Sequence, residues 1–142
     1  MAKSRRWVRS PDSGGKKIPP EVRSRVAERI ERYAEEHYAG RYTRLGIRFR
    51  GQFCYIDAFT EPDEPSEQLL ELRGETRDEY LELMRNLPTH LCRLRYFGDE
   101  DSWGVSFYTY SHMRYELSVF PSGKFYGTPE DAFDVGALYL QG

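Results

Sequence analysis

The sequence predicts an α+β fold: an antiparallel meander sheet of five to six strands, with an N-terminal helix packed on one face and a C-terminal helix beside it. Three observations predict it. An apolar stripe with helical spacing follows a proline pair, two segments alternate apolar and polar residues around short turns, and a capped helix start lies near the end. The 142 residues suffice for one domain with a core, and 15% aromatic residues distinguish the chain from disordered ones despite a mean hydropathy of -0.76.

Residues 1–18 are predicted to be a flexible basic arm, and residues 19–142 a single α+β domain. Residues 1–17 contain six Lys and Arg residues against Asp12, a local charge of +5. Because the whole chain has a net charge of -2, the remainder carries -7. A basic arm on an acidic body can contact polyanions.

Residues 21–38 are predicted to form the first helix. The prolines at positions 19 and 20 suit a helix start, since a proline in the first turn lacks only an N–H that would have no partner. Gly40 suits the helix end. The predicted buried stripe recurs every three or four residues and consists of Val22, Val26, Ile30, Tyr33 and His37.

Residues 41–59 are predicted to form a hairpin around a two-residue turn at Arg50-Gly51. Counting outward from that turn pairs Ile47 with Cys54, and Arg44 with Asp57. Apolar side chains then share one face, and Arg44 meets a carboxylate on the other.

Residues 60–88 are predicted to be an acidic, partly mobile insertion. Residues 61–80 contain eight carboxylates against two arginines, and the segment begins with a proline-rich stretch. A short helix is expected at 76–86, with Tyr80, Leu83 and Met84 facing inward.

Residues 89–110 are predicted to form the central hairpin around an acidic turn at 98–101. Its register pairs Leu94 with Val105, and Cys92 with Phe107, on an apolar face that ends at His90. We expect Ile47, Ile56, Leu94 and Phe107 to be buried in the core.

The chain is expected to end with a strand at 115–120, a short sixth strand at 124–126 and a final helix. Thr128 caps that helix, Pro129 occupies its first position, and Glu130 and Asp131 complement its positive end.

The opposite face of the sheet, called the outer face below, is the predicted binding site. Arginines alternate there with aromatic rings, and Asp57 is the one acidic residue expected among them. Such a face can stack unpaired bases and hold their phosphates. The alternative is a second packing layer covered by a helix or by the insertion. The proposed binding residues are Arg44, Arg48, Phe53, Tyr55, Arg93, Arg95, Tyr108 and Tyr110.

Two other clusters are candidates for a small enzyme. Cys54, His90 and Cys92 fall on the same predicted face, but a structural zinc site needs a fourth ligand, and free cysteines are usually core residues. The second cluster, His112 with Arg114 and Glu116, lies near a turn without a catalytic motif beside it.

Three segments and the helix start GTPEDAF resemble a family of short uncharacterised bacterial proteins: RFRGQFCYIDAF, THLCRLRYFGDEDSW and YTYSHMRYE. The resemblance covers residues 18–140 and leaves out the basic arm. It implies a self-contained bacterial domain and transfers no functional residue, because no activity is established for the family.

The sequence therefore predicts a non-catalytic binding module, with single-stranded nucleic acid or another protein as partner. The alternative is an enzyme that uses one of the two clusters above. No cofactor or metal is expected. The chain has no apolar run of transmembrane length and no signal peptide, and two cysteines fit reduced thiols, so we expect a cytoplasmic location and no membrane association.

Overall fold

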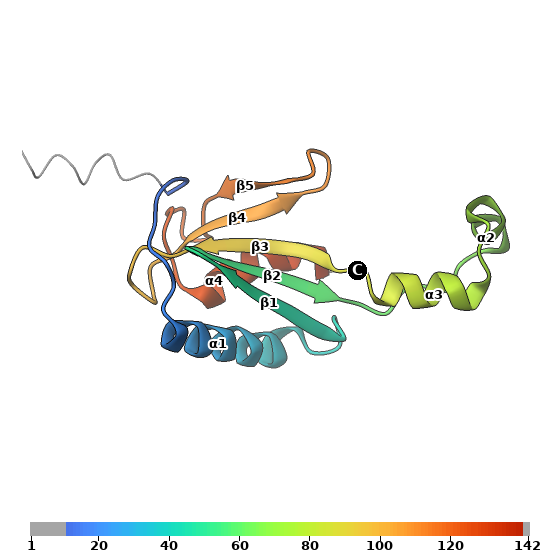
Figure 1. Cartoon of the computed structure of the whole chain (residues 1–142), viewed down its shortest axis with the longest axis horizontal. Coiled ribbons are helices and arrows are strands. Elements are labelled where there is room, and N and C mark those ends of the chain that lie inside the picture. The colour runs from blue at the N-terminus through green and yellow to red at the C-terminus, as the bar shows by residue number, and fades with distance from the viewer. Residues whose placement is uncertain (1–10, 141–142) are drawn as a thin grey trace, which may run out of the picture.

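The computed structural model describes residues 11–140 and confirms the α+β prediction (Figure 1). Five strands form one open antiparallel sheet, and each strand pairs with its neighbours in the sequence. The predicted sixth strand is absent from the described residues, where a single bridge pairs Trp103 with Gly127. The strands are β1 (Arg44–Arg50), β2 (Phe53–Phe59), β3 (Thr89–Arg95), β4 (Gly104–Thr109) and β5 (Arg114–Ser118).

Helices α1 (Pro20–Tyr38) and α4 (Pro129–Gly136) cover one face of the sheet. In the view of Figure 1, α4 lies behind the sheet and α1 runs below β1. A short 3-10 helix at Ala137–Leu140 follows α4. Thr128 caps α4 as predicted, since its side chain accepts a hydrogen bond from the N–H of Asp131.

The first hairpin turns one residue later than predicted. Arg50 pairs with Phe53, so the turn is Gly51-Gln52, and Ile47 lies opposite Ile56 instead of Cys54. Gly51 has φ +59, a conformation that glycine adopts readily and arginine does not. The pairing moves by two residues, so each side chain keeps its predicted face.

The central hairpin has the predicted register up to Cys92. Leu94 pairs with Val105, and Cys92 with Phe107. Between β2 and β3, however, the register shifts after Ile56, so that Asp57 lies opposite His90. Leu91 is the extra residue of a β-bulge.

The core lies between the sheet and the two helices. Val22, Val26 and Ile30 of α1 are buried as predicted, but Ala34 continues the stripe, while His37 is exposed. The predicted core was correct for Ile56 and Leu94, which are fully buried. It was wrong for Ile47 and Phe107, which are half-buried.

The acidic insertion contains two helices where one was predicted, α2 (Glu67–Arg73) and α3 (Arg77–Arg85). Both project beyond the end of the sheet (Figure 1). Tyr80 and Met84 of α3 are half-buried, but Leu81 is the buried residue and Leu83 is exposed, contrary to the prediction.

Candidate functional site

The outer face faces away from α1 and α4, and no helix of the described chain lies over it in Figure 1. Strand alternation places seven of the eight predicted binding residues there, and Tyr110, directly after β4, lies beside them with its ring against Tyr108. Arg44, Arg48 and Tyr110 are exposed, whereas Phe53, Tyr55, Arg93 and Tyr108 are half-buried.

The arginines of this face lie over aromatic rings. The guanidinium of Arg93 is 4.2 Å from the ring centre of Phe53, and that of Arg48 is 4.8 Å from the ring centre of Tyr55. Arg44 lies 3.6 Å over Phe59, a ring that we did not predict to belong to the site. Cation–π attraction favours these positions of the guanidinium groups over the rings.

Arg95 differs from the other predicted binding residues because it is buried. It donates hydrogen bonds to the backbone carbonyls of Gly14 (2.7 Å) and Asp12 (3.2 Å). The second half of the predicted arm, residues 11–18, thus contacts the body, and Lys16 N–H also donates to the carbonyl of Tyr96. The first ten residues lie outside the described part of the chain. Arg95 is therefore occupied and not available to a ligand in this conformation.

A buried carboxylate lies at the other end of the face. The side chain of Asp57 is 7% exposed, and its two oxygens contact different side chains. Oδ1 is 2.8 Å from Nδ1 of His90, and Oδ2 is 3.3 Å from Nη2 of Arg48. When Nδ1 donates to Asp57, Nε2 of the neutral imidazole remains as an acceptor.

Three tyrosine side chains surround this pair. The ring of His90 lies 4.8 Å from Tyr108 and 6.3 Å from Tyr115, and the hydroxyl of Tyr110 accepts the backbone N–H of His90. Burial raises the pKa of both Tyr110 and Tyr115, and nearby Asp57 adds to the effect. The buried hydroxyl of Tyr115 has no hydrogen-bond partner in the described chain.

The predicted cluster of Cys54, His90 and Cys92 does not form. Both cysteines are buried in the core with free thiols, while the bulge turns His90 to the outer face. Burial raises the pKa of each thiol, which makes it a poor nucleophile or ligand at neutral pH. Within residues 11–140, no three His, Cys, Asp or Glu side chains are arranged to hold a metal ion.

The second predicted cluster does form, at the surface. Oε2 of Glu116 lies 2.9 Å from Nδ1 of His112 and 3.0 Å from Nε of Arg114. The hydrogen bonds from Arg114 and then His112 lower the pKa of Glu116. The side chains of His112 and Arg114 are 59% and 69% exposed, so water screens their interactions with Glu116.

Sequence reasoning missed His90, Tyr115 and Phe59 as members of the outer face. A signal for His90 was available, because Leu91 and Cys92 are adjacent apolar residues in a strand that otherwise alternates. Strict alternation would expose Leu91, whereas a bulge buries both residues.

Comparison with known proteins does not identify the site. No family model, no curated protein and no solved structure matches this chain. Among the described helices, none is long and apolar enough to cross a bilayer.

Proposed function

We propose that the protein is a non-catalytic binding module that holds single-stranded nucleic acid on its outer face. The observation that carries this proposal is that arginines of the outer face contact aromatic rings instead of carboxylates. On the outer face, Arg44 and Arg93 lie over rings and make no ion pair with a described residue, whereas Arg25, Arg77 and Arg85 elsewhere form ion pairs with glutamates.

This arrangement suits a chain of phosphates and bases. A guanidinium over a ring can still offer its N–H groups and its second side, so it can bind a phosphate or stack on a base. Each stacked base contributes about 1–3 kcal/mol, with little dependence on its identity. We therefore expect micromolar affinity that falls with salt and discriminates weakly between sequences.

Fluorescence anisotropy with labelled single-stranded RNA and DNA at low salt tests the proposal. The informative variant is Arg44→Ala/Arg93→Ala, because neither arginine pairs with a described carboxylate and Asp57 keeps both of its partners. We expect the double variant to bind about tenfold more weakly, which corresponds to about 1.4 kcal/mol. The matched control is Arg25→Ala, which removes an arginine of α1 that is ion-paired with Glu100 and should leave binding unchanged.

Two results would contradict the proposal. One is no binding by the wild-type chain at about 50 µM, well above the expected micromolar range. The other is a loss of binding only when residues 1–10 are deleted, which would assign the affinity to the basic arm.

A second candidate function rests on the Asp57–His90 pair. A histidine held by a buried carboxylate can act as a general base. On RNA, Nε2 would take the proton of a 2′-hydroxyl as the 2′-oxygen bonds to phosphorus, and the 5′-oxygen would leave with a proton from water. Gel analysis of the same RNA and DNA samples tests it. RNA alone should be cleaved, and His90→Asn should abolish cleavage while its amide still reaches Asp57.

A further inference from the structure

Negative and positive side chains gather on different parts of the folded molecule. Residues 61–87, called the helical arm below, contain nine carboxylates and three arginines, a net charge of -6. The outer face combines five arginines, Arg50 included, with Asp57, a net charge of +4. An acidic projection and a basic face thus belong to the same chain.

The helical arm has a preformed shape. Ser66 caps α2, and Thr76 and Glu79 form a capping box at the start of α3. Ion pairs from Arg77 to Glu64 and from Arg85 to Glu61 tie the proline-rich entry segment to α3. Binding a partner would therefore cost little ordering of this segment.

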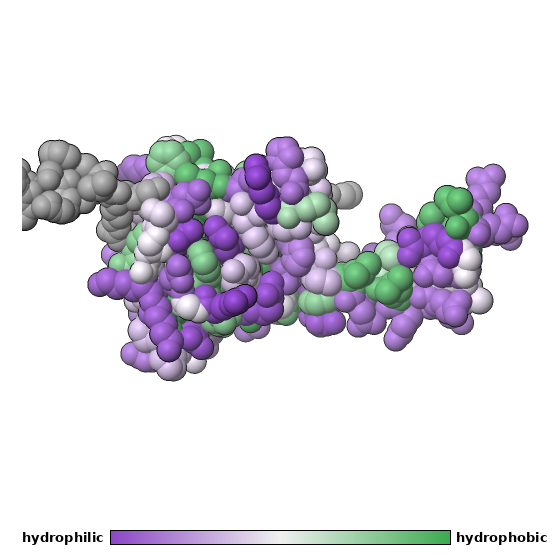
Figure 2. Space-filling view, turned by 45° about the horizontal axis from the view of Figure 1, so that its top comes forward, coloured by the Kyte–Doolittle hydropathy of each residue, from purple (hydrophilic) through white to green (hydrophobic). Residues whose placement is uncertain are grey.

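The helical arm also presents apolar side chains to water. Leu72 is 86% exposed, and Leu83 and Leu87 are 42% and 49% exposed. Figure 2 shows apolar groups on the surface of the arm among hydrophilic ones. Exposed leucines next to carboxylates are typical of a surface that contacts a partner.

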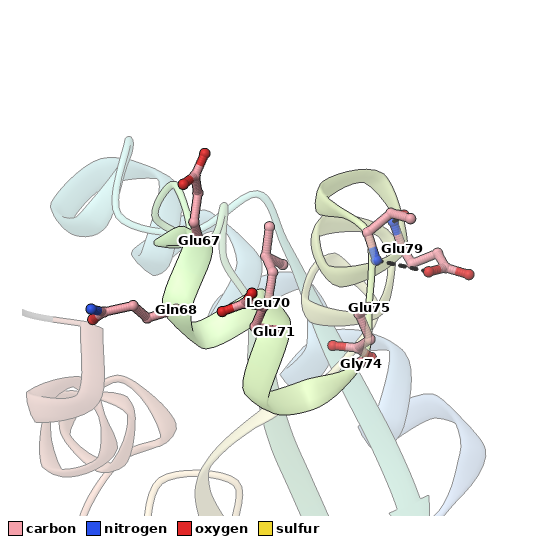
Figure 3. A pocket seen from close by; sticks show the side chains of 8 residues that line it. Glu67, Gln68, Leu70, Glu71, Gly74, Glu75 and Glu79 are labelled. Atoms are coloured by element: carbon pink, nitrogen blue, oxygen red, sulfur yellow. Dashed lines mark hydrogen bonds between the residues drawn. The ribbon is translucent and has the colours of Figure 1, made fainter.

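A cavity of about 700 Å³ between α2 and α3 can receive a cationic side chain. Glutamates line it, among them Glu67 and Glu71 of α2 and Glu75 in the loop after it, while Glu79 accepts a hydrogen bond from the backbone N–H of Thr76 (Figure 3). Glu67 and Glu71 have no basic partner among the described residues, whereas Glu75 pairs with Arg73. Leu70 offers an apolar wall for the stem of an arginine.

We propose that the helical arm of one molecule docks on the outer face of a second copy of this chain. The carboxylates of the arm then face the arginines that lack ion pairs, Arg44 and Arg93 among them, and the exposed leucines cover the rings of the face. The arm cannot reach its own outer face, because it leaves the sheet at the junction of β2 and β3 and points away from it (Figure 1). The contact is heterologous, so it builds rings, reciprocal dimers or chains.

The docking does not depend on the proposed function, but it would affect nucleic-acid binding. The same arginines would serve both the arm and a nucleic acid, so the two would compete. The competition rests on the proposed function, whereas the self-association does not.

Sedimentation velocity over a range of protein concentrations tests the docking. We expect the average mass of the wild-type chain to rise with concentration at low salt and to return to that of a monomer at about 0.5 M salt, where charges on the surface are screened. The face variant is Arg44→Ala/Arg93→Ala, and the arm variant is Glu67→Gln/Glu71→Gln. Each should weaken self-association by about tenfold or more. The control is Arg25→Ala/Glu36→Gln, which changes one arginine and one exposed glutamate on α1 and should associate like the wild type.

Mixing the two variants is the decisive measurement. The face variant keeps an intact arm and the arm variant keeps an intact face, so an equimolar mixture should form a one-to-one complex and nothing larger. A wild-type chain that stays monomeric at all concentrations would overturn the proposal, as would a mixture that does not associate. The arm substitutions are on exposed helices and should not affect folding. If the face variant does not fold, the arm variant alone tests the docking. An arm variant that associates as strongly as the wild type would then contradict the proposal.

Addition of single-stranded DNA to the wild-type assembly separates the two proposals. Dissociation into DNA-bound monomers supports both. Self-association without DNA binding supports the docking and contradicts the proposed function. DNA binding by a chain that stays monomeric without DNA supports the proposed function and contradicts the docking.

Discussion

At the scale of single residues, the position of Leu91 determines that His90 lies on the outer face. As the extra residue of the bulge it enters the core, and the chain on its N-terminal side is turned over. His90 thereby moves from beside Cys92 to Asp57, which it meets at 2.8 Å. Bulges commonly re-aim a side chain in this way.

The backbone of Leu91 also leaves no room for a side chain at Gly136 of α4. A Cβ at position 136 would lie 2.8 Å from the carbonyl carbon and oxygen of Leu91, and backbone atoms cannot yield as a flexible side chain can. We expect Gly136→Ala to lower the free energy of unfolding by about 1–3 kcal/mol, the usual range for overpacking. Alanine is normally the better helix former by about 1 kcal/mol, so the sign of the effect is informative.

Urea denaturation measures that free energy. Glu36→Ala on the exposed side of α1 serves as the control, since it changes helix propensity without a packing conflict. A Gly136→Ala protein as stable as the wild type would show that α4 does not approach β3 as closely as described.

At the scale of elements, polar groups join α1 to α4 above the apolar core. The hydroxyls of Tyr33 and Tyr38 donate to the two oxygens of Asp134, at 2.7 and 2.6 Å. Burial first, and then the hydrogen bond to Asp134, raises the pKa of Tyr38 to about 12. Arg29 binds Glu130 through two hydrogen bonds of 2.9 and 2.8 Å. These directional contacts add to the apolar packing between α1 and α4 and fix their relative orientation.

The Arg29–Glu130 pair predicts a pH-dependent contribution to stability. Burial is the largest single influence and raises the pKa of Glu130, but the hydrogen bonds from Arg29, from a backbone N–H and from Thr128, together with the charge of Arg29, outweigh it, so the pKa lies below its ordinary value of 4.5. A group with a lowered pKa in the folded state stabilises the fold above its unfolded pKa, and the contribution is lost as the pH falls through the folded pKa. Glu130→Gln should therefore lower the free energy of unfolding by about 1 kcal/mol at pH 7, and by less at about pH 3, below the ordinary pKa of the carboxyl.

Denaturation of both proteins at several pH values provides the measurement. Glu36→Gln, an exposed residue of α1, is the matched control and should show no such trend. A Glu130→Gln deficit that is equal at pH 7 and pH 3 would mean that the charge of Glu130 contributes nothing.

At the scale of the whole molecule, the body and the helical arm are separate in their packing. The central core draws on α1, α4 and the sheet, and Leu81, the buried residue of α3, is not part of it. Ala58 already pairs with Thr89 at the base of the arm, so a short turn can connect β2 to β3.

This separation predicts that the body folds without the arm. Replacement of residues 61–87 by a short glycine- and asparagine-containing turn should leave a cooperative thermal transition with a Tm within about 5 °C of the wild type. Circular dichroism should show a loss of helix and no loss of sheet. A non-cooperative transition would indicate that the arm contributes to the core.

Much of this fold could be predicted from the sequence, because its determinants are local. Proline at the start of α1, the Thr128 cap and the apolar stripe of α1 act over a few residues. Strand alternation likewise placed seven of the eight predicted binding residues on the outer face, even where the turn at Gly51 was predicted one residue early.

The remainder was decided by the tertiary structure, because it depends on contacts between residues far apart in the chain. Whether Leu91 enters the core depends on the space that α4 and β2 leave for it, and that choice brings His90 to Asp57, 33 residues away. Whether Arg95 is available depends on where residues 12–14 cross β3. The sequence by itself determined the elements and their faces, since these follow from the period of apolar residues. Packing determined the bulge and the coverage of each face, since both follow from how whole elements fit together.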